Sequence, residues 1–357
     1  MSFVWMAIGV VLLTFGAELL VRGAVRLAAA VGLSPLIIGL TVVAFGTGAP
    51  ELAVSLKAAL SGQADIALGN VVGSNMLNVL FVLGISALIA PLAASSQLVR
   101  LDVPVMIGVS ALTWLMAANG MIDRLDGFIL ASGLVGYTLL LVYMGRRSPV
   151  AEQAPDLGEE PAKKTPWSLI QLVIGLALLV LGARWFVDGA TDLARMLGVS
   201  ELMIGLTIVA MGTSLPEVAT SIVASLRGQR DMAVGNVVGS NIFNILGVLG
   251  LTASVSESGV SVAPEAWRFD IPIMTAVAFM CLPIFFTGGR ISRLEGALLL
   301  GYYTAYIIFL VLAATSHAAI DLYSNALVWF ILPITLLAVA FSVWQAMAQR
   351  RAERNPA

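Results

Sequence analysis

Charged residues are scarce in this chain. Asp, Glu, Lys and Arg together make up 11% of its 357 residues, against roughly 25% in an ordinary soluble domain. Apolar residues reach 59%, and the mean hydropathy is +0.97. Because so few charges cannot cover the surface of a water-soluble protein of this length, we expect most of the chain to be surrounded by lipid.

Cysteine and histidine are almost absent, and this excludes several classes of function. The single cysteine, Cys281, cannot form a disulfide within the chain, and the single histidine is His317. One residue of each type supplies neither a zinc or haem ligand set nor a Ser/His/Asp triad, so we expect no enzyme activity and no cofactor. The net charge of −2, without a basic cluster, argues against nucleic acid as a partner.

Apolar stretches long enough to cross a bilayer recur along nearly the whole sequence. A spanning helix needs about 20 mainly apolar residues, so we predict an all-α polytopic membrane protein. The predicted helices cover 3–27, 34–60, 66–90, 101–118, 126–145, 167–193, 200–226, 232–254, 268–287, 294–314 and, as a probable eleventh span, 324–346.

One polar, glycine-rich segment occurs twice. The copies occupy 39–84 and 205–250 at a constant offset of 166, and 29 of the 46 aligned residues are identical. We therefore predict a duplicated unit of five helices. The predicted parts are a first repeat (1–145), a solvated Pro-rich and charged linker (146–166), a second repeat (167–314), and an extra C-terminal helix with a basic tail (315–357).

The two repeats are expected to be inverted relative to each other. An odd number of spans makes the second repeat start on the opposite side of the membrane, and an in-plane pseudo-two-fold axis then relates the halves, as in many transporters. Basic residues favour the cytoplasmic side. With the N-terminus outside, 14 of the 19 Lys and Arg residues lie inside. We therefore predict a cytoplasmic linker and C-terminus, in a bacterial inner membrane.

Each repeat carries one glutamate in the middle of an apolar helix. Glu51 and Glu217 follow prolines, and a carboxylate at such a depth is costly and by default functional. Pro50 and Pro216 each lack a backbone N–H, so the preceding turn loses a hydrogen bond. A broken helix that offers carbonyl oxygens beside a carboxylate suits a hard cation such as sodium or calcium.

Polar residues flank both glutamates at helical spacing. Four stripes with a spacing of four residues are predicted: Thr47, Glu51 and Ser55; Thr213, Glu217 and Ser221; Asn70, Ser74 and Asn78; and Asn236, Ser240 and Asn244. A structural alternative is that Asn70, Asn75, Asn236 and Asn241 hold helices together by hydrogen bonds. The small-xxx-small pairs Gly69 with Gly73, and Gly235 with Gly239, are expected to let helices pack closely.

The strings GTGAPEL at 46–52, GTSLPEV at 212–218 and GNVVGSN in both copies resemble the alpha repeats of the calcium/cation antiporter superfamily, in particular its bacterial sodium/calcium exchanger family. The resemblance covers about 1–314 and implies that the glutamates bind calcium and sodium in alternation. It implies calcium ligands at Glu51, Glu217 and the backbone oxygens of Thr47 and Thr213. Implied sodium ligands are the carbonyls of Ala44 and Ala210 and the hydroxyls of Ser74, Ser240 and Ser214, with Asn78 and Asn244 beside them.

The chain departs from a symmetric ligand set at two places. Gly48 occupies the position that matches Ser214, and amides stand at Asn78 and Asn244, where some relatives have an aspartate. The pocket then holds two formal negative charges, which neutralise one Ca²⁺, two Na⁺ or two protons. This count leaves the stoichiometry open and keeps proton coupling as an alternative.

These features predict a secondary active antiporter that exchanges Ca²⁺ for Na⁺ by alternating access at a midplane site. The alternative is a calcium/proton antiporter that uses the same glutamates. A channel and an intramembrane enzyme are weaker alternatives. Against the enzyme, no nucleophile and base pair stands out in the sequence. The expected partners are the transported ions and the lipid bilayer, and the sequence does not indicate an oligomeric state.

Overall fold

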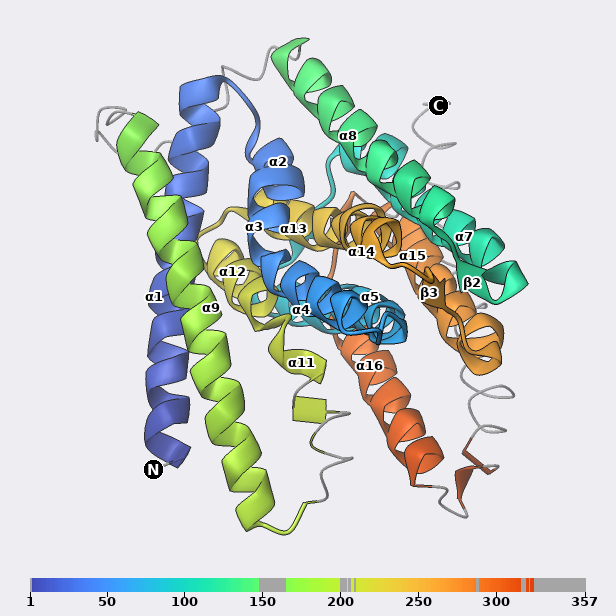
Figure 1. Cartoon of the computed structure of the whole chain (residues 1–357). Helices are drawn as coiled ribbons and strands as arrows, with labels where there is room; N and C mark the ends of the chain where they lie inside the picture. The colour runs from blue at the N-terminus through green and yellow to red at the C-terminus, as the bar shows by residue number, and fades with distance from the viewer. Residues whose placement is uncertain are drawn as a thin grey trace, which may run out of the picture.

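The computed structural model describes residues 2–147, 165–199, 204, 207–208, 210–286, 289–315, 319–320 and 322–323 (Figure 1). The predicted eleventh span at 324–346 and most of the predicted linker lie outside these residues. The prediction of a mainly helical membrane fold is confirmed. The total number of spans stays a prediction.

Helices occupy the five stretches predicted for the first half. Several are divided by π-helical turns, labelled η. The elements are α1 (Ser2–Val31), α2 (Pro35–Ile38), η1 (Gly39–Val43), α3 (Ala44–Thr47), α4 (Ala49–Leu60), α5 (Asp65–Met76), η2 (Leu77–Val82), α6 (Leu83–Ile89), η3 (Leu98–Asp102), α7 (Val103–Met116), the 3₁₀ turn η4 (Ala117–Asn119) and α8 (Arg124–Arg147).

The second half contains a matching series. Its elements are α9 (Thr165–Met196), α11 (Ala210–Gly212), α12 (Leu215–Leu226), α13 (Arg230–Phe243), η7 (Asn244–Leu249), α14 (Gly250–Val255), η8 (Ala266–Asp270), α15 (Ile271–Phe286) and α16 (Arg293–Ala314). Within the described residues, eight helices are long and apolar enough to cross a membrane, and α2 to α4 form a further bent pair. Large apolar side chains are exposed along many of these helices, as a lipid-facing surface requires.

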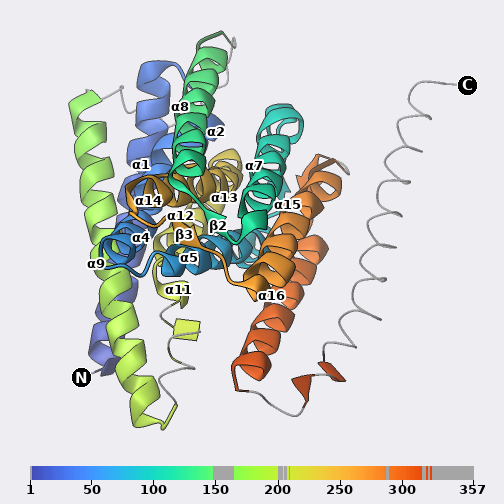
Figure 2. The ribbon, with the colours of Figure 1, turned by 45° about the vertical axis from the view of Figure 1, so that its right-hand side comes forward.

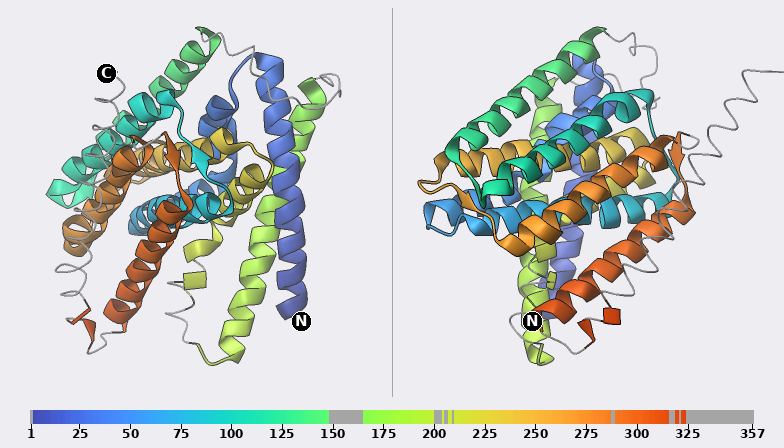
Figure 3. Two further views of the ribbon diagram at one scale, coloured as in Figure 1. Left: turned by 180° about the vertical axis from the view of Figure 1, so that it is seen from behind. Right: turned by 90° about the vertical axis from the view of Figure 1, so that its right-hand side faces the viewer.

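The helices form three groups. The long helices α1 and α9 lie side by side at one edge of the molecule, and α4, α5, α12 and α13 fill its centre (Figure 1). On the other side stand α7, α8, α15 and α16 (Figure 2), and the right-hand view of Figure 3 shows them in front of the central helices. The two copies of the repeated segment thus lie at the heart of the molecule.

Glycines spaced by seven residues hold α1 against α9. A methyl group placed on Gly9 would lie 2.8 Å from the Gly182 carbonyl oxygen, and one on Gly16 would lie 2.8 Å from that of Gly175. Partner numbers fall along α9 as they rise along α1, so the two helices are antiparallel. Gly9 and Gly175, like Gly16 and Gly182, are counterparts at the repeat offset of 166. Side chains larger than hydrogen would separate the two backbones.

Two short strand ladders tie the halves together. β1 (Leu92–Ala93) pairs antiparallel with β4 (Arg290–Ile291), and β2 (Met121–Ile122) pairs antiparallel with β3 (Val260–Ser261). Each ladder joins a loop of the first half to a loop of the second. Such reciprocal pairing is what a pseudo-two-fold relation between the halves produces.

Candidate functional site

Both predicted helix breaks lie two residues before a Pro-Glu pair. In the first half, α3 ends at Thr47, Gly48 adopts φ −79° and ψ 0°, and α4 starts at Ala49, with a bend of 44° between the two segments. Pro50 sits in the first turn of α4, where its missing N–H removes no helical hydrogen bond. Glu51 therefore lies in the first turn of α4, beside the break.

The second copy is broken at the same position. α11 ends at Gly212, Ser214 adopts φ −90° and ψ 6°, and α12 starts at Leu215. Pro216 again occupies the first turn, and Glu217 follows it. The sequence prediction of two interrupted glutamate helices is thus confirmed in the described parts of both halves.

The Glu51 carboxylate is surrounded by hydroxyl groups, two of them from the second half. Its side chain is buried, with 1% of the residue surface exposed. Ser214 Oγ donates a hydrogen bond to Glu51 Oε1 at 2.8 Å and lies 3.1 Å from Ser74 Oγ. The Thr213 hydroxyl lies close to the same carboxylate. The first ligand candidate is therefore enclosed by residues of both repeats.

Glu217 has the mirrored environment. It is 1% exposed, the Thr47 hydroxyl from the first half lies near its carboxylate, and the two glutamates are close enough to repel each other. Thr47 Oγ1 also donates to Asn236 Oδ1 at 3.3 Å. The two carboxylates predicted from the repeat thus converge on one buried region.

One asparagine links each glutamate helix to the helix that follows it. Asn70 Nδ2 donates to the Glu51 carbonyl oxygen at 3.2 Å and to Ser55 Oγ at 3.0 Å. Asn236 Nδ2 repeats both contacts, to the Glu217 carbonyl oxygen at 3.5 Å and to Ser221 Oγ at 3.0 Å. The alternative reading of these asparagines as helix-linking residues is therefore confirmed for this pair.

Several buried oxygens of the site have no hydrogen-bond partner among the described residues. Leaving such a group unpaired costs about 1–3 kcal/mol, and more for a charged group. A cation that these oxygens could coordinate would remove that penalty. The atoms are Glu51 Oε2, Glu217 Oε2, Thr213 Oγ1, Ser240 Oγ, Asn78 Oδ1 and Asn244 Oδ1.

No protein cation neutralises the two glutamates within the described part of the chain, where neither forms a salt bridge. A cluster of three or more His, Cys, Asp or Glu side chains is also absent from these residues. The donor set is thus two carboxylates with neutral oxygens. Such a set matches a hard, weakly held cation better than a resident transition metal.

The remaining predicted ligands line the same helices. Ala44 is the first residue of α3 and is fully buried, and its carbonyl oxygen already accepts a hydrogen bond from the Gly48 N–H at 3.0 Å. The Thr47 hydroxyl also lies 3.5 Å from that oxygen. Ala210 begins α11, while Asn78 lies within η2 and Asn244 begins η7. Single π turns inside helices occur frequently at functional sites.

The structure gives a physical reason for the missing hydroxyl at Gly48. A Cβ at this position would lie 2.8 Å from Phe243 Cδ1 and 3.0 Å from the Ala44 carbonyl oxygen. The Phe243 ring also stacks on Phe45, with 4.8 Å between ring centroids. The counterpart of Phe243 is the smaller Leu77, and the counterpart of Gly48 is Ser214. The large ring thus takes the volume that a serine would need.

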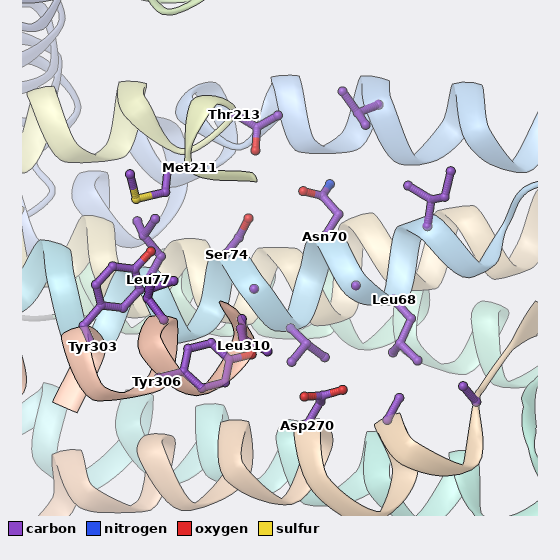
Figure 4. Close-up of a pocket in the computed structure, with 18 of the residues that line it drawn as sticks. Leu68, Asn70, Ser74, Leu77, Met211, Thr213, Asp270, Tyr303, Tyr306 and Leu310 are labelled. Carbon is purple, nitrogen blue, oxygen red and sulfur yellow. The ribbon is translucent and has the colours of Figure 1, made fainter. Parts of the chain in front are cut away.

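A cavity of about 670 Å³ reaches one side of the site (Figure 4). Asn70, Ser74 and Thr213 line it, so the predicted ligand Ser74 borders this cavity. The rest of its wall is mainly apolar, with Ser261, Asp270, Tyr303 and Tyr306 as polar exceptions. The cavity therefore borders the candidate site on the side of Asn70, Ser74 and Thr213.

The sequence did not point to two aspartate-tyrosine pairs, Asp270 with Tyr306 at the cavity and Asp102 with Tyr137 in the other half. Asp270 and Tyr306 line the cavity, whereas the matching Asp102 is fully buried. Tyr137 Oη donates to Asp102 Oδ1 at 3.0 Å. Each aspartate stands two residues before a proline, Pro104 or Pro272, but nothing in the sequence shows that one aspartate is enclosed and the other lines a cavity.

Comparisons with known proteins agree with the fold and the repeated segment. The family model described as sodium/calcium exchanger protein matches residues 1–143 and 167–312. The chain is 31% identical to the sodium/calcium exchanger MaX1 of Methanosarcina acetivorans, over 87% of this chain and 98% of that protein. It is 37% identical to the inner membrane protein YrbG of Escherichia coli, over 76% and 85% respectively.

A solved structure shows the same architecture. The sodium/calcium exchanger from Methanococcus jannaschii superimposes with a TM-score of 0.74 and is 30% identical, covering 86% of this chain and 97% of that one. The family model spans both halves of the sequence, including both copies of the glutamate segment. This chain is therefore an integral membrane protein and belongs to the sodium/calcium exchanger protein family.

Proposed function

We propose that the protein is a secondary antiporter that exchanges Ca²⁺ for Na⁺ at the buried site between α4, α5, α12 and α13. One observation carries the proposal: Glu51 and Glu217 are both buried, and each has a carboxylate oxygen without a partner among the described residues. Two buried carboxylates that repel each other need positive charge. Relatives named sodium/calcium exchangers support calcium and sodium as the ions that supply it.

Exchange follows from charge and from competition for the same oxygens. One Ca²⁺ or two Na⁺ neutralise the two carboxylates, while both loads together would leave excess positive charge in a low dielectric. The ions therefore displace each other. The site lies between the halves, because the Ser214 hydroxyl of the second half contacts Glu51 of the first. A relative movement of the halves would therefore alter access to the site, while α4 stays packed on α5 and α12 on α13.

The cavity gives the proposed transporter a direction. α11, which contributes Met211 to the cavity wall, lies toward the end of the molecule at which α1 begins (Figure 1). With the N-terminus outside, as the basic residues favour, the cavity would lie on the outer side of the site. Sodium would then enter, and calcium would leave, through this cavity in a bacterial inner membrane.

Transport in proteoliposomes tests the proposal. Vesicles loaded with sodium and diluted into sodium-free buffer at fixed pH should take up ⁴⁵Ca²⁺, and uptake should vanish in both Glu51→Gln and Glu217→Gln. Asp188→Asn is the matched control, since it removes a carboxylate whose side chain is 66% exposed and lies 3.9 Å from the Arg184 guanidinium. Its uptake should equal that of the wild type.

The same assay separates the two coupling ions. Calcium uptake that ignores sodium and follows an imposed pH gradient would replace this proposal with calcium/proton exchange at the same glutamates. Full activity in either glutamine variant would overturn the shared carboxylate site whichever ion is coupled.

A further inference from the structure

Asn75 links the two halves by hydrogen bonds next to the candidate site. It lies on α5 and is 2% exposed. Its Nδ2 donates to the backbone oxygen of Asn241 at 3.4 Å and to Met274 Sδ at 3.5 Å. Its Oδ1 accepts a hydrogen bond from Asn244 Nδ2 at 3.1 Å. One side chain of the first half thus contacts three elements of the second.

These neighbours allow only one orientation of the Asn75 amide. A carbonyl oxygen and a thioether sulfur accept hydrogen bonds but cannot donate them. The NH₂ group of Asn75 must therefore face Asn241 and Met274, which leaves its oxygen toward Asn244. Asn244 in turn has to present its NH₂ group to Asn75. Its Oδ1 then points away from Asn75, and it is buried without a partner among the described residues.

The free Asn244 oxygen belongs to the polar face of the candidate site. Asn236, Ser240 and Asn244 are spaced by four on one helical face, and Asn236 accepts from Thr47 beside Glu217. Ser240 Oγ is likewise buried and without a partner in the described structure. An amide oxygen on this face attracts a cation, whereas the NH₂ group of a flipped amide would repel it.

The equivalent contact in the other half is not made. Asn241 is the counterpart of Asn75, and its Nδ2 donates to Met106 Sδ at 3.4 Å, just as Asn75 donates to Met274. Asn241 Oδ1 and both amide atoms of Asn78, however, have no partner among the described residues. Of the two mirrored amide pairs in the described structure, only Asn75 with Asn244 is therefore joined by a hydrogen bond.

We propose that Asn75 is a positioning residue for cation binding, because it fixes the Asn244 amide with its oxygen toward the ion. The inference rests on the proposed function, in which Asn244 is one of the groups that bind the transported cation. Asn75 itself does not touch the ion in this arrangement. Its contribution is to exclude the flipped orientation of its neighbour.

A double-mutant cycle on Ca²⁺ affinity tests this role. Asn75→Ala frees the Asn244 amide to flip, so the Ca²⁺ concentration for half-maximal uptake should rise by about tenfold, which corresponds to roughly 1.4 kcal/mol. In the Asn244→Asp background a carboxylate presents oxygen in either orientation, and it also faces the Asn75 oxygen. Asn75→Ala should therefore cause no loss there, or a gain in affinity.

An equal loss of Ca²⁺ affinity in the wild-type and Asn244→Asp backgrounds would mean that Asn75 acts only through packing. An unchanged Ca²⁺ concentration for half-maximal uptake in Asn75→Ala would also overturn the proposal. Size-exclusion profiles and thermal unfolding of the purified variants establish that they fold. Asn75→Ser serves as a second variant with the same expectation if Asn75→Ala fails to fold.

A third variant separates this inference from the proposed function. If Asn244→Leu leaves Ca²⁺ affinity unchanged, then Asn244 does not bind the ion and the positioning role falls with it, even where Glu51→Gln abolishes uptake. If neither Asn244→Leu nor Glu51→Gln affects uptake, the proposed ion site itself is wrong.

Discussion

The two copies of the repeated segment share 29 of 46 residues but are packed differently among the described residues. In the second half, a methyl group on Gly239 would lie 2.6 Å from the Leu40 carbonyl oxygen, and one on Gly235 would lie 2.8 Å from that of Leu36. In the first half, Gly69 and Gly73 have no described atom within 4 Å of such a methyl group and line the cavity instead. Within the described residues, the expected close packing is thus found for Gly235 with Gly239 and not for Gly69 with Gly73.

This contrast shows that the same short sequence can have two different environments in one molecule. The same GNVVGSN string lies against a neighbouring backbone in one half and borders a cavity in the other. Since the string is the same, the difference among the described residues comes from what surrounds each copy. An antiporter with inverted repeats needs such an inequality, because its two states exchange the roles of the halves.

The largest effect is expected at the packed glycines. Gly239→Ala forces the Leu40 backbone to move, and overpacking of this kind costs typically 1–3 kcal/mol. A methyl group on Gly73 meets no described atom within 4 Å, so thermal unfolding of purified Gly73→Ala should be nearly unchanged. Its transport should nevertheless slow, because the methyl group would obstruct closure of the cavity. Equal destabilisation by the two substitutions would contradict the contrast between the halves.

The next effect concerns the missing hydroxyl. Gly48→Ser alone should destabilise the protein by about 1–3 kcal/mol, because the new side chain meets the Phe243 ring. Combined with Phe243→Leu, it reproduces the pair found in the other half, Ser214 with Leu77. The double variant should then be more stable than the sum of the single effects by at least about 0.5 kcal/mol. Thermal unfolding of all four proteins measures this coupling, and strict additivity would contradict the packing explanation.

These comparisons also indicate how far the sequence could lead. The helices, the break before Glu51 and the convergence of both glutamates follow from apolar length, proline chemistry and the repeat, and all were predicted. Which side of the site carries the cavity could not be predicted, because the two copies have the same local preferences. The position of Phe243 over Gly48 and the orientation of Asn244 depend on contacts between halves, which no local pattern specifies.

A smaller effect is expected at the two aspartate-tyrosine pairs. Tyr137→Phe removes a hydrogen bond to Asp102, which is fully buried and keeps only a 3.4 Å contact with Gln97 Nε2. We expect a loss of about 1–2 kcal/mol in the free energy of unfolding. Tyr306→Phe changes a residue that lines the cavity beside Asp270, so it should cost less than about 0.5 kcal/mol. Chemical denaturation of both variants in detergent compares them, and an equal loss would show that the aspartates are not held differently.

The smallest effect is expected at an ion pair that only one half contains. Arg227, at the end of α12, bonds Glu18 of α1 at 2.6 Å, and Glu18 also pairs with Arg22. The counterpart of Glu18 is Arg184, so no equivalent bridge can link α9 to α4 at this position. Arg227 is more than half exposed, and Arg227→Gln should therefore cost less than about 1 kcal/mol. Exposed pairs are screened by salt, so the difference in unfolding temperature should shrink between low and high ionic strength. A large loss that ignores salt would instead mean that this one-sided bridge holds α1 against α12 in the present state, and so contributes to the inequality of the halves.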